Sequence, residues 1–392
     1  MDKIYISDQD RITAHVDGIA PDLIAISDQI YDLAETGLKE YGSSKLLEDY
    51  LQQEGFQVER GLAGLPTAFK AVWEHGEGGP SIGFLCEYDA LPMGHGCGHH
   101  MQGPAILGAV SAIKALYRDQ PYRLVVYGTP AEETIGGKIL MQERGCFQDI
   151  DVALMTHGSP TTCVDIKSMA LENFVVTFHG VSAHAAMSPD QGRSALDAAL
   201  LSFQGIEFLR EHVKEDTRIH YTIRDAGGPP NVVPEKAVAE YTLRSYDTDY
   251  LHTVVARFLK VIEGAAHMTE TTFTLQQDPA FKAKIPCLRL NDVIMEQARR
   301  FGAPRCTAPR EKTGSTDFGN VMYEIPGCCL RIAFAPEGSA AHSQEYLDAG
   351  KSEAGHQALL YSARILAAVG TELIGDQELM QEIQEEFRRK KG

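Results

Sequence analysis

Glu87-Tyr-Asp-Ala-Leu-Pro-Met-Gly-His-Gly-Cys-Gly-His-His100 is the stretch that decides the fold of this chain. The apolar run Ile82-Gly-Phe-Leu-Cys86 leads into it and predicts a buried strand. A helix is predicted after it, because apolar residues recur at spacings of three and four from Ile106 to Tyr117 and Pro104 suits a first turn. Cys97-Gly-His99 therefore lies in a loop between a strand end and a helix start, where ligands gather in open α/β sheets.

Three further apolar runs have the length of strands that are buried on both faces of a sheet. They span residues 124–127, 152–155 and 330–334. Helical patterns separate the early runs, and two surface helices are expected before them, over residues 19–36 and 43–54. This alternation predicts an α/β fold with a mainly parallel twisted sheet flanked by helices.

Between about residue 170 and residue 280 the pattern changes to that of a small separate domain. Strands are predicted at 172–179, 218–223, 236–245 and 271–275, with helices at 196–206 and 251–262. This β-α-β-β-α-β order is typical of a ferredoxin-like unit. We therefore predict a metal-binding catalytic domain of residues 1–168 and 284–392, with residues 169–283 inserted as a lid and dimerisation domain. The unpaired edge strand of such a sheet can pair with a second copy, so a homodimer is expected.

Composition excludes several classes of function. The net charge of −18 argues against nucleic acid as a partner, because phosphate binding needs a basic face, and it disfavours anionic membrane surfaces. Eight cysteines are too few for a disulfide scaffold in a chain of 392 residues. The N-terminus lacks the layout of a signal peptide, and no apolar run approaches transmembrane length. We expect a cytoplasmic protein with a small-molecule substrate.

Residues of metal-ligand type follow all four apolar runs. Cys97 and His99 come after the first, Glu132-Glu133 after the second, His157 immediately after the third and His342 a few residues after the fourth. Any one of these histidines could be an ordinary loop residue. Together they indicate a metal site at the carboxyl edge of the sheet.

The adjacent carboxylates Glu132 and Glu133 suggest two different roles, one as a metal ligand and one as a general base. In an irregular segment they can point in different directions, so one can bind metal while the other acts as general base toward a metal-activated water. The alternative is a pair of solvated acids at a helix start.

Cys97 lies in a Gly-rich loop between His95 and His99. It could be a buried structural thiol or a nucleophile paired with histidine. A thiolate ligand, bridging two cations, fits the surrounding His and Glu residues better. A structural zinc cluster is not expected, because paired C-x-x-C motifs are absent from the sequence.

The polar residues of the predicted insertion give a weaker functional signal than the residues of metal-ligand type described above. His184 and His220 are candidates by type, and Asn231 follows the turn Gly227-Gly-Pro-Pro230. Arg244 alternates with Tyr241 and Leu243 on its predicted strand, so it lies on the polar face. Such an arginine is usually solvated, but it can clamp a substrate carboxylate if that face closes over the site.

Taken together, these motifs resemble the metal-dependent amidohydrolase and peptidase family of aminoacylase and carboxypeptidase G. The branch of indole-acetyl-amino-acid, hippurate and p-aminobenzoyl-glutamate hydrolases is the most similar. The matching motifs span nearly the full chain in the order of the family: Asp89-Ala-Leu-Pro, Gly96-Cys-Gly-His99, Pro130-Ala-Glu-Glu with Gly136-Gly137, His157, Gly180-Val-Ser-Ala-His-Ala-Ala with Pro189 and Gly192-Arg, Asn231-Val-Val-Pro with Arg244, Ser315-Thr-Asp-Phe, and Ala341-His342.

The resemblance implies a site for two divalent cations (zinc, manganese or cobalt) and a general base, Glu132. It implies that the insertion dimerises, that Asn231 and Arg244 bind the substrate carboxylate, and that His220 is offered to the active site of the partner subunit. The implied metal ligands are Cys97 (bridging), His99, Glu133, His157 and His342. One departure concerns His100 and Gln102, where the branch usually has Asp or Asn and then often His, which bears on metal preference and substrate.

The predicted function is hydrolysis of the amide bond of an N-acyl amino acid or a related small amide by a metal-activated water. A dipeptidase or carboxypeptidase acting at the same site is an alternative. A non-catalytic binding protein that kept the fold and a hydrolase with Cys97 as nucleophile are rivals from other classes.

Overall fold

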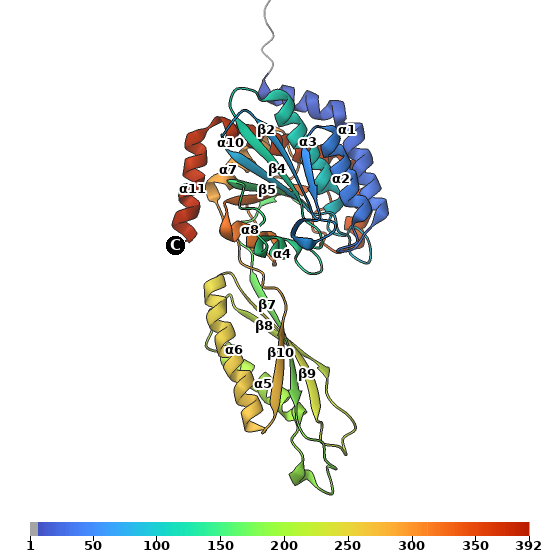
Figure 1. Ribbon diagram of the computed structural model, residues 1–392, viewed down its shortest axis with the longest axis vertical. Coiled ribbons are helices and arrows are strands. Elements are labelled where there is room, and N and C mark those ends of the chain that lie inside the picture. The colour runs from blue at the N-terminus through green and yellow to red at the C-terminus, as the bar shows by residue number, and fades with distance from the viewer. Residues whose placement is uncertain (1–6, 312, 392) are drawn as a thin grey trace, which may run out of the picture. The chain divides into compact units, whose positions relative to one another are not determined.

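The structure, a computed structural model, describes residues 7–311 and 313–391 (Figure 1). It divides into two compact units. The first combines the residues up to Lys167 with those from Lys284 onward, and the second is Ser168–Ala283. The second unit thus starts one residue before the predicted insertion and ends at the same position.

The first unit is built on a seven-stranded sheet of order β1-β2-β4-β3-β5-β11-β6. Its central strands are mutually parallel and contain the four apolar runs, apart from Phe334 of the last run, which directly follows β11. They are β3 (Ser81–Cys86), β4 (Tyr122–Gly128), β5 (Val152–Ser159) and β11 (Gly327–Ala333). The outer strands β1 (Gln57–Arg60), β2 (Phe69–His75) and β6 (Cys163–Val164) pair antiparallel. The prediction of a mainly parallel α/β sheet is confirmed.

Helices bury both faces of this sheet, which explains the apolar runs in its central strands. Phe84 packs into the larger core, and its neighbour Leu85 packs into the core on the opposite face. The larger core is covered by α1 (Asp8–Leu33), α2 (Tyr41–Gln53), α3 (Gln102–Leu116), α7 (Leu288–Arg300), α10 (Glu353–Gly375) and α11 (Gln377–Lys391) (Figure 1). The smaller core is covered by α4 (Gly137–Glu143) and α8 (Phe318–Glu324).

The first helix is longer than predicted. It was expected from residue 19, but α1 begins at Asp8, where Ser7 and Asp10 form a capping box. Pro21 lies inside the helix rather than in its first turn. The helix ends at Leu33 rather than at the predicted residue 36, and Ala34 adopts the left-handed conformation, with φ of 44°.

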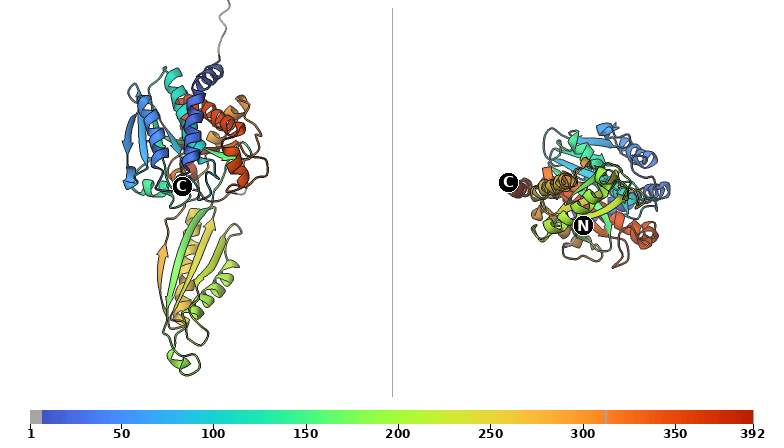
Figure 2. Two further views of the ribbon diagram at one scale, coloured as in Figure 1. Left: turned by 90° about the vertical axis from the view of Figure 1, so that its right-hand side faces the viewer. Right: turned by 90° about the horizontal axis from the view of Figure 1, so that it is seen from below.

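The second unit is a four-stranded antiparallel sheet of order β10-β7-β9-β8. Its elements are β7 (Ala170–His179), α5 (Ala195–Arg210), β8 (Arg218–Asp225), β9 (Lys236–Ser245), α6 (Thr248–Met268) and β10 (Thr272–Gln277). The helices α5 and α6 pack on one face, where alternate residues of β9 such as Tyr241 and Leu243 are buried (Figure 1, Figure 2). The predicted β-α-β-β-α-β order is confirmed. Among the described strands, β8 pairs with β9 alone and is an edge.

Two features near the C-terminus differ from the sequence expectation. By length and composition α10 could span a membrane, so the expectation that no run approaches that length was wrong; 72% of its apolar window is buried against the rest of the first unit. Residues 376–391, whose high charge in the sequence favours a solvated face, contain the amphipathic helix α11. Its residues Leu379, Ile383 and Phe387 are buried, since apolar residues at helical spacing supply a packing face despite the high charge.

Candidate metal centre

The candidate ligands converge because parallel strands end at one edge of the sheet. The loop after β3 turns at Gly98, whose φ of 78° favours glycine, into the short 3-10 helix η2 (His99–Met101) that starts α3. Glu132 and Glu133 follow β4 through a turn in which Ala131 has a φ of 62°. His342 lies in the loop between β11 and α9 (Gln344–Gly350), and its backbone N–H donates to Gly96 O at 2.9 Å. This hydrogen bond joins the loop after β11 to the loop after β3.

A first group of ligand atoms comes from Cys97, Glu133 and His342, which all lie within 4.8 Å of one another. Cys97 Sγ is 2.6 Å from Glu133 Oε1, and His342 Nε2 is 3.5 Å from the same oxygen. Cys97 is buried, whereas His342 is exposed on the open side. One thiol, one carboxylate and one imidazole form a donor set that suits zinc and similar cations.

A second group contains His99 and His157 together with Glu87. The rings of His99 and His157 meet edge to face at 5.2 Å between centroids. His157 was predicted to follow its strand, but β5 continues to Ser159, so this histidine lies within the strand opposite Arg331. Its Nδ1 is 2.9 Å from Gly158 O, which leaves Nε2 for a ligand.

Asp89 orients His99. The Nδ1 of His99 lies 3.0 Å from Asp89 O and 3.2 Å from Asp89 Oδ1, so its N–H donates to Asp89 and Nε2 is the nitrogen left to bind a metal. The other carboxylate oxygen of Asp89 accepts from the backbone N–H of Glu133 at 3.0 Å. The buried Nε2 of His99 has no hydrogen-bond partner in the described structure. A buried, oriented and unpartnered imidazole nitrogen is what a metal ligand requires.

The charges around these atoms favour a cation. In the chain alone, burial opposes protonation of His99, yet Glu87, Asp89 and Glu133 together raise its pKa to about 10. Burial, and then the charges of Glu87 and Asp317, raise the pKa of Glu132 well above its ordinary value. A divalent ion placed among these groups would stabilise the ionised carboxylates. The residues present therefore fit a metal centre.

The environment of Cys97 disfavours a cysteine nucleophile. Burial and then the carboxylate of Glu133 raise the pKa of the Cys97 thiol well above its ordinary value. Nucleophilic cysteines have the opposite environment, in which nearby positive charge lowers the pKa. Cys97 becomes a thiolate in this position only beside a cation, which is the role of a ligand.

Glu132 occupies a place between the two groups. Its carboxylate, together with His99 and Glu133, forms a cluster within 4.8 Å, and it also lies within that distance of Glu87 and Asp317. The backbone before it is fixed because Ala131 N donates to Glu40 Oε1 at 2.9 Å. This places Glu132 beside the ligands, as the predicted base position requires.

Sequence reasoning missed three charged residues behind this centre: Glu87, Lys138 and Asp317. They are buried, with Lys138 Nζ 2.5 Å from Glu87 Oε1 and 2.7 Å from Asp317 Oδ1. Glu87 directly follows β3, and the rule that selected the other ligands by their place after a strand could have included it. Lys138 had no comparable signal, since a lysine near a helix start is ordinarily solvated.

His100 and Gln102, the departures from the family pattern, are both buried. His100 does not join the ligand groups; its Nε2 lies 3.0 Å from Gly350 O, on the side of α9. Gln102 contacts Glu87 twice, since its Nε2 donates to Glu87 Oε2 at 2.8 Å and its Oε1 accepts from Glu87 N at 3.1 Å.

The predicted substrate-binding residues belong to the second unit. His220 on β8 faces Thr242 of β9, and Arg244 lies two residues further along the same face, opposite the helices. Arg244 is half-buried, and its Nε has no hydrogen-bond partner among the described residues. Asn231 is exposed in the loop between β8 and β9, where its carbonyl accepts from Ala185 N at 2.9 Å. Their roles remain predictions.

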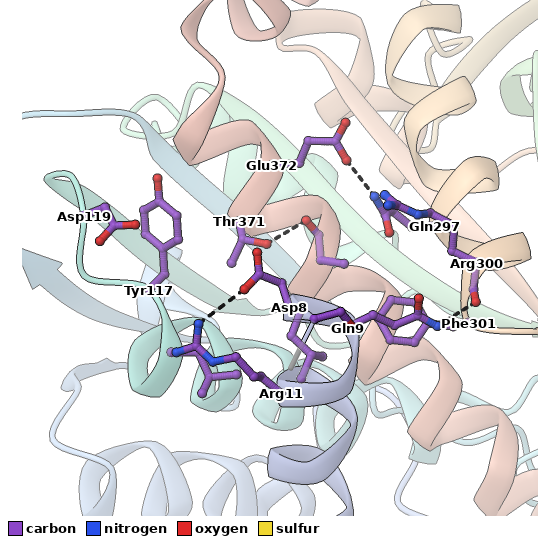
Figure 3. A pocket seen from close by; sticks show the side chains of 14 residues that line it. Asp8, Gln9, Arg11, Tyr117, Asp119, Gln297, Arg300, Phe301, Thr371 and Glu372 are labelled. Atoms are coloured by element: carbon purple, nitrogen blue, oxygen red, sulfur yellow. Dashed lines mark hydrogen bonds and ion pairs between the residues drawn. The ribbon is translucent and has the colours of Figure 1, made fainter. Parts of the chain in front are cut away.

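A separate pocket of about 450 Å³ lies at the opposite end of α3 from the candidate centre (Figure 3). It is lined by the start of α1 and by parts of α3, α7 and α10. Its polar side chains pair among themselves, as Asp8 does with Arg11 at 3.3 Å and Gln297 with Glu372 at 2.7 Å. The pocket holds none of the candidate ligands.

Comparison with known proteins gives the following similarities. Residues 86–365 match the family described as Peptidase family M20/M25/M40. The chain is 31% identical to a p-aminobenzoyl-glutamate hydrolase subunit of Escherichia coli (strain K12), over 93% of this chain and 91% of that protein. It is 32% identical to Xaa-Arg dipeptidase of Homo sapiens, over 96% of this chain and 91% of that protein. A solved structure of Bacillus subtilis YXEP protein, a dinuclear metal binding peptidase, has a TM-score of 0.71 at 18% identity, over 92% of this chain and 99% of that one.

Proposed function

Since the chain belongs to peptidase family M20/M25/M40, we propose that it cleaves the amide bond of an N-acyl amino acid or a dipeptide that carries a free carboxylate. Membership makes the chain a metal-dependent hydrolase of amide bonds. The observation that carries the proposal is the convergence of Cys97, Glu133 and His342 on one point beside His99 and His157.

We propose two divalent cations, with zinc, manganese and cobalt as candidates. The residues that would hold them are Cys97, His99, Glu133, His157 and His342. When bound, such cations supply a Lewis acid for the scissile carbonyl and lower the pKa of a bound water. Cys97, a member of the first group, is the proposed bridging residue, as the resemblance to the family implies.

The remaining steps belong to the side chains of this chain. Glu132 takes a proton from the attacking water and returns it to the leaving amine, a role that suits a carboxylate whose environment raises its pKa. Asp89 holds His99 in the tautomer that leaves Nε2 free.

Substrate binding is proposed for the second unit. Arg244 and Asn231 bind the substrate carboxylate, and the unpartnered Nε of Arg244 supports this role. We further propose that two chains form a homodimer through their second units and that His220 serves the active site of the partner subunit, where it steadies the oxyanion. The edge strand β8, with Tyr221 and Ile223 exposed, supports such an interface.

The two relatives favour different leaving groups. The name of the Escherichia coli protein specifies glutamate, and that of the human protein specifies arginine. The dipeptidase function is therefore the second candidate. Both candidates need the same centre, and they differ in the side chain that follows the cleaved bond.

The test is a substrate panel run with metal-depleted and metal-restored protein. The panel contains p-aminobenzoyl-glutamate, N-acetyl and N-benzoyl amino acids, indole-3-acetyl-aspartate, and dipeptides ending in Arg or Lys. We expect hydrolysis that is lost after EDTA treatment and returns with zinc, manganese or cobalt. Hydrolysis that survives chelation would indicate a cysteine nucleophile, and protein that binds metal but cleaves no member of the panel would indicate a binding protein.

A further inference from the structure

Glu87 is a buried carboxylate that the five-ligand centre leaves without a role. It follows the last residue of β3 and is 1% exposed. Both of its oxygens are held: Oε1 accepts from Lys138 Nζ at 2.5 Å, and Oε2 accepts from Gln102 Nε2 at 2.8 Å. A side chain fixed at both oxygens and at its backbone N–H has one orientation.

That orientation points Oε2 at the metal-facing side of His99. Glu87 Oε2 lies 3.2 Å from His99 Nε2, yet Nε2 has no hydrogen-bond partner in the described structure. The Nδ1–H of His99 is already directed at Asp89, so Nε2 is the nitrogen that faces this carboxylate oxygen. In the chain alone a proton on Nε2 pairs with Glu87. A cation that replaces this proton would lie near both atoms and offset the charge of the carboxylate in its place. The second histidine, His157, places its ring nitrogen within 4.8 Å of both atoms.

The net charge of the buried cluster around Lys138 also favours a cation near Glu87. Glu87 and Asp317 share one ammonium group, that of Lys138, and all three side chains are at most 1% exposed. With both acids ionised and His99 neutral, as an imidazole that binds a metal is, the cluster carries one negative charge in excess. Removing such a charge from water is costly unless a partner compensates it. A cation beside Glu87 Oε2 supplies that compensation.

We propose that Glu87 is a further ligand of the cation held by His99 and His157, and that Gln102 and Lys138 fix its carboxylate for that role. This inference rests on the proposed function, because it requires a bound cation. It gives that cation a hard oxygen donor beside two imidazoles, which favours zinc or manganese over softer cations. It also explains Gln102, a position at which the chain departs from its family, because this residue holds the carboxylate of Glu87 in place.

The experiment compares wild-type protein with Glu87→Gln, which keeps the volume and removes the charge. Lys138 then pairs with Asp317 alone, so the buried cluster becomes neutral and the fold is expected to survive. Ion content after gel filtration and binding isotherms for zinc and manganese are measured. We expect one of two ions to bind about 10- to 100-fold more weakly, with the other unchanged.

Glu48→Gln is the matched control, because Glu48 of α2 is also a buried acid paired with a cationic side chain, and its partner is Arg60 of β1. It is expected to leave both ion affinities unchanged. If Glu87→Gln binds both ions as the wild type does, Glu87 is not a ligand.

A crystal structure of zinc-loaded wild-type protein decides the question independently of how the variant folds. We expect a Glu87 oxygen at about 2.0–2.2 Å from an ion. Two ions on the five predicted ligands with Glu87 beyond about 3 Å would overturn this inference and leave the proposed function standing. Wild-type protein that holds no ion at all would overturn the proposed function itself.

Discussion

At the scale of single residues, Asp89 connects the two groups of candidate ligands. One of its oxygens receives the His99 Nδ1–H, and the other receives the backbone N–H of Glu133. The carboxylate therefore joins one ligand of each group to the same anchor. Residues in this position set the tautomer and raise the basicity of the ligating histidine.

Replacing Asp89 with Asn should weaken metal binding. The amide keeps one acceptor oxygen and turns an NH2 group toward either His99 or Glu133, so one of the two hydrogen bonds is lost. We expect metal affinity to fall about 10- to 100-fold, measured by calorimetric titration of the metal-depleted protein. An affinity equal to that of the wild type would mean that Asp89 O alone orients His99.

Glu132→Gln tests the assignment of the base. The amide cannot accept a proton, so turnover is expected to fall by about 10²–10⁴ while both ions stay bound. The measurements are kcat on the best substrate of the panel and ion content by mass spectrometry. Glu133→Gln is the comparison, since loss of a ligand should lower ion content as well. A Glu132→Gln variant that binds metal and turns over at nearly the wild-type rate would contradict the role.

The candidate ligands could be selected from sequence, but the buried charged residues beside them could not. Cys97, His99, Glu133, His157 and His342 each combine a ligand chemistry with a place near a strand end, which a single sequence reveals. Lys138 pairs with residues 51 and 179 positions away. No local pattern distinguishes such a lysine from a solvated one, because pairing over that distance depends on the folded sheet.

At the scale of elements, periodicity found the central strands and missed the limits of several elements. Apolar runs mark β3, β4, β5 and β11 because both faces are buried. The strand β5 extends to Ser159 past the end of the apolar run, so composition ended the prediction too early. The start of α1 was missed because its first turn is polar and is defined by the Ser7 capping box.

The tail helix α11 gives a prediction that depends on pH. The side chain of Cys287, the N-cap residue of α7, does not cap the helix. Glu386 of α11 takes this role, since Leu288 N and Arg289 N each donate to its carboxylate at 2.9 Å. Burial opposes ionisation, but Lys390 and these two N–H groups lower the pKa of Glu386 to about 2. We expect Glu386→Gln to destabilise the protein by about 1 kcal/mol at pH 7, as loss of a cap does.

The sign of the pH effect follows from the shift. The pKa is lower in the folded chain than its ordinary value of 4.5, so ionised Glu386 stabilises the fold above that pH. This contribution declines as the pH falls from 4.5 toward 2. Thermal unfolding of both proteins between pH 7 and pH 3 should show a difference that shrinks with acid. Glu382→Gln, which removes an exposed pair with Arg289, should change stability by less than about 0.5 kcal/mol.

At the scale of the whole molecule, each unit has a hydrophobic core of its own. The insertion could be recognised because its rhythm of strands and helices differs from that of the sequence around it. Dimerisation is different, since an edge strand indicates where a second copy can pair and not whether it does. On the second unit, Leu200 and Phe208 of α5 and Ile223 of β8 are exposed apolar side chains. They form the proposed contact surface.

We expect the protein to sediment as a dimer and Ile223→Lys to sediment as a monomer, because a lysine on an edge strand opposes pairing. If His220 serves the partner subunit, the monomeric variant should also lose hydrolysis while it keeps its metal. A variant that is monomeric and fully active would contradict the proposal that His220 acts in the active site of the partner subunit.

Mixing two inactive variants distinguishes whether His220 acts in the active site of its own chain or in that of the partner subunit. Glu132→Gln and His220→Ala should each be inactive alone. In a mixed dimer, the subunit with intact Glu132 receives His220 from its partner, so one complete site forms, whereas action within a chain leaves both sites defective. Free exchange makes half of the dimers mixed, so about a quarter of the wild-type activity per subunit is expected on mixing. Activity that stays at the level of the separate variants, in a sample shown to contain mixed dimers, would place His220 in the site of its own chain or in none.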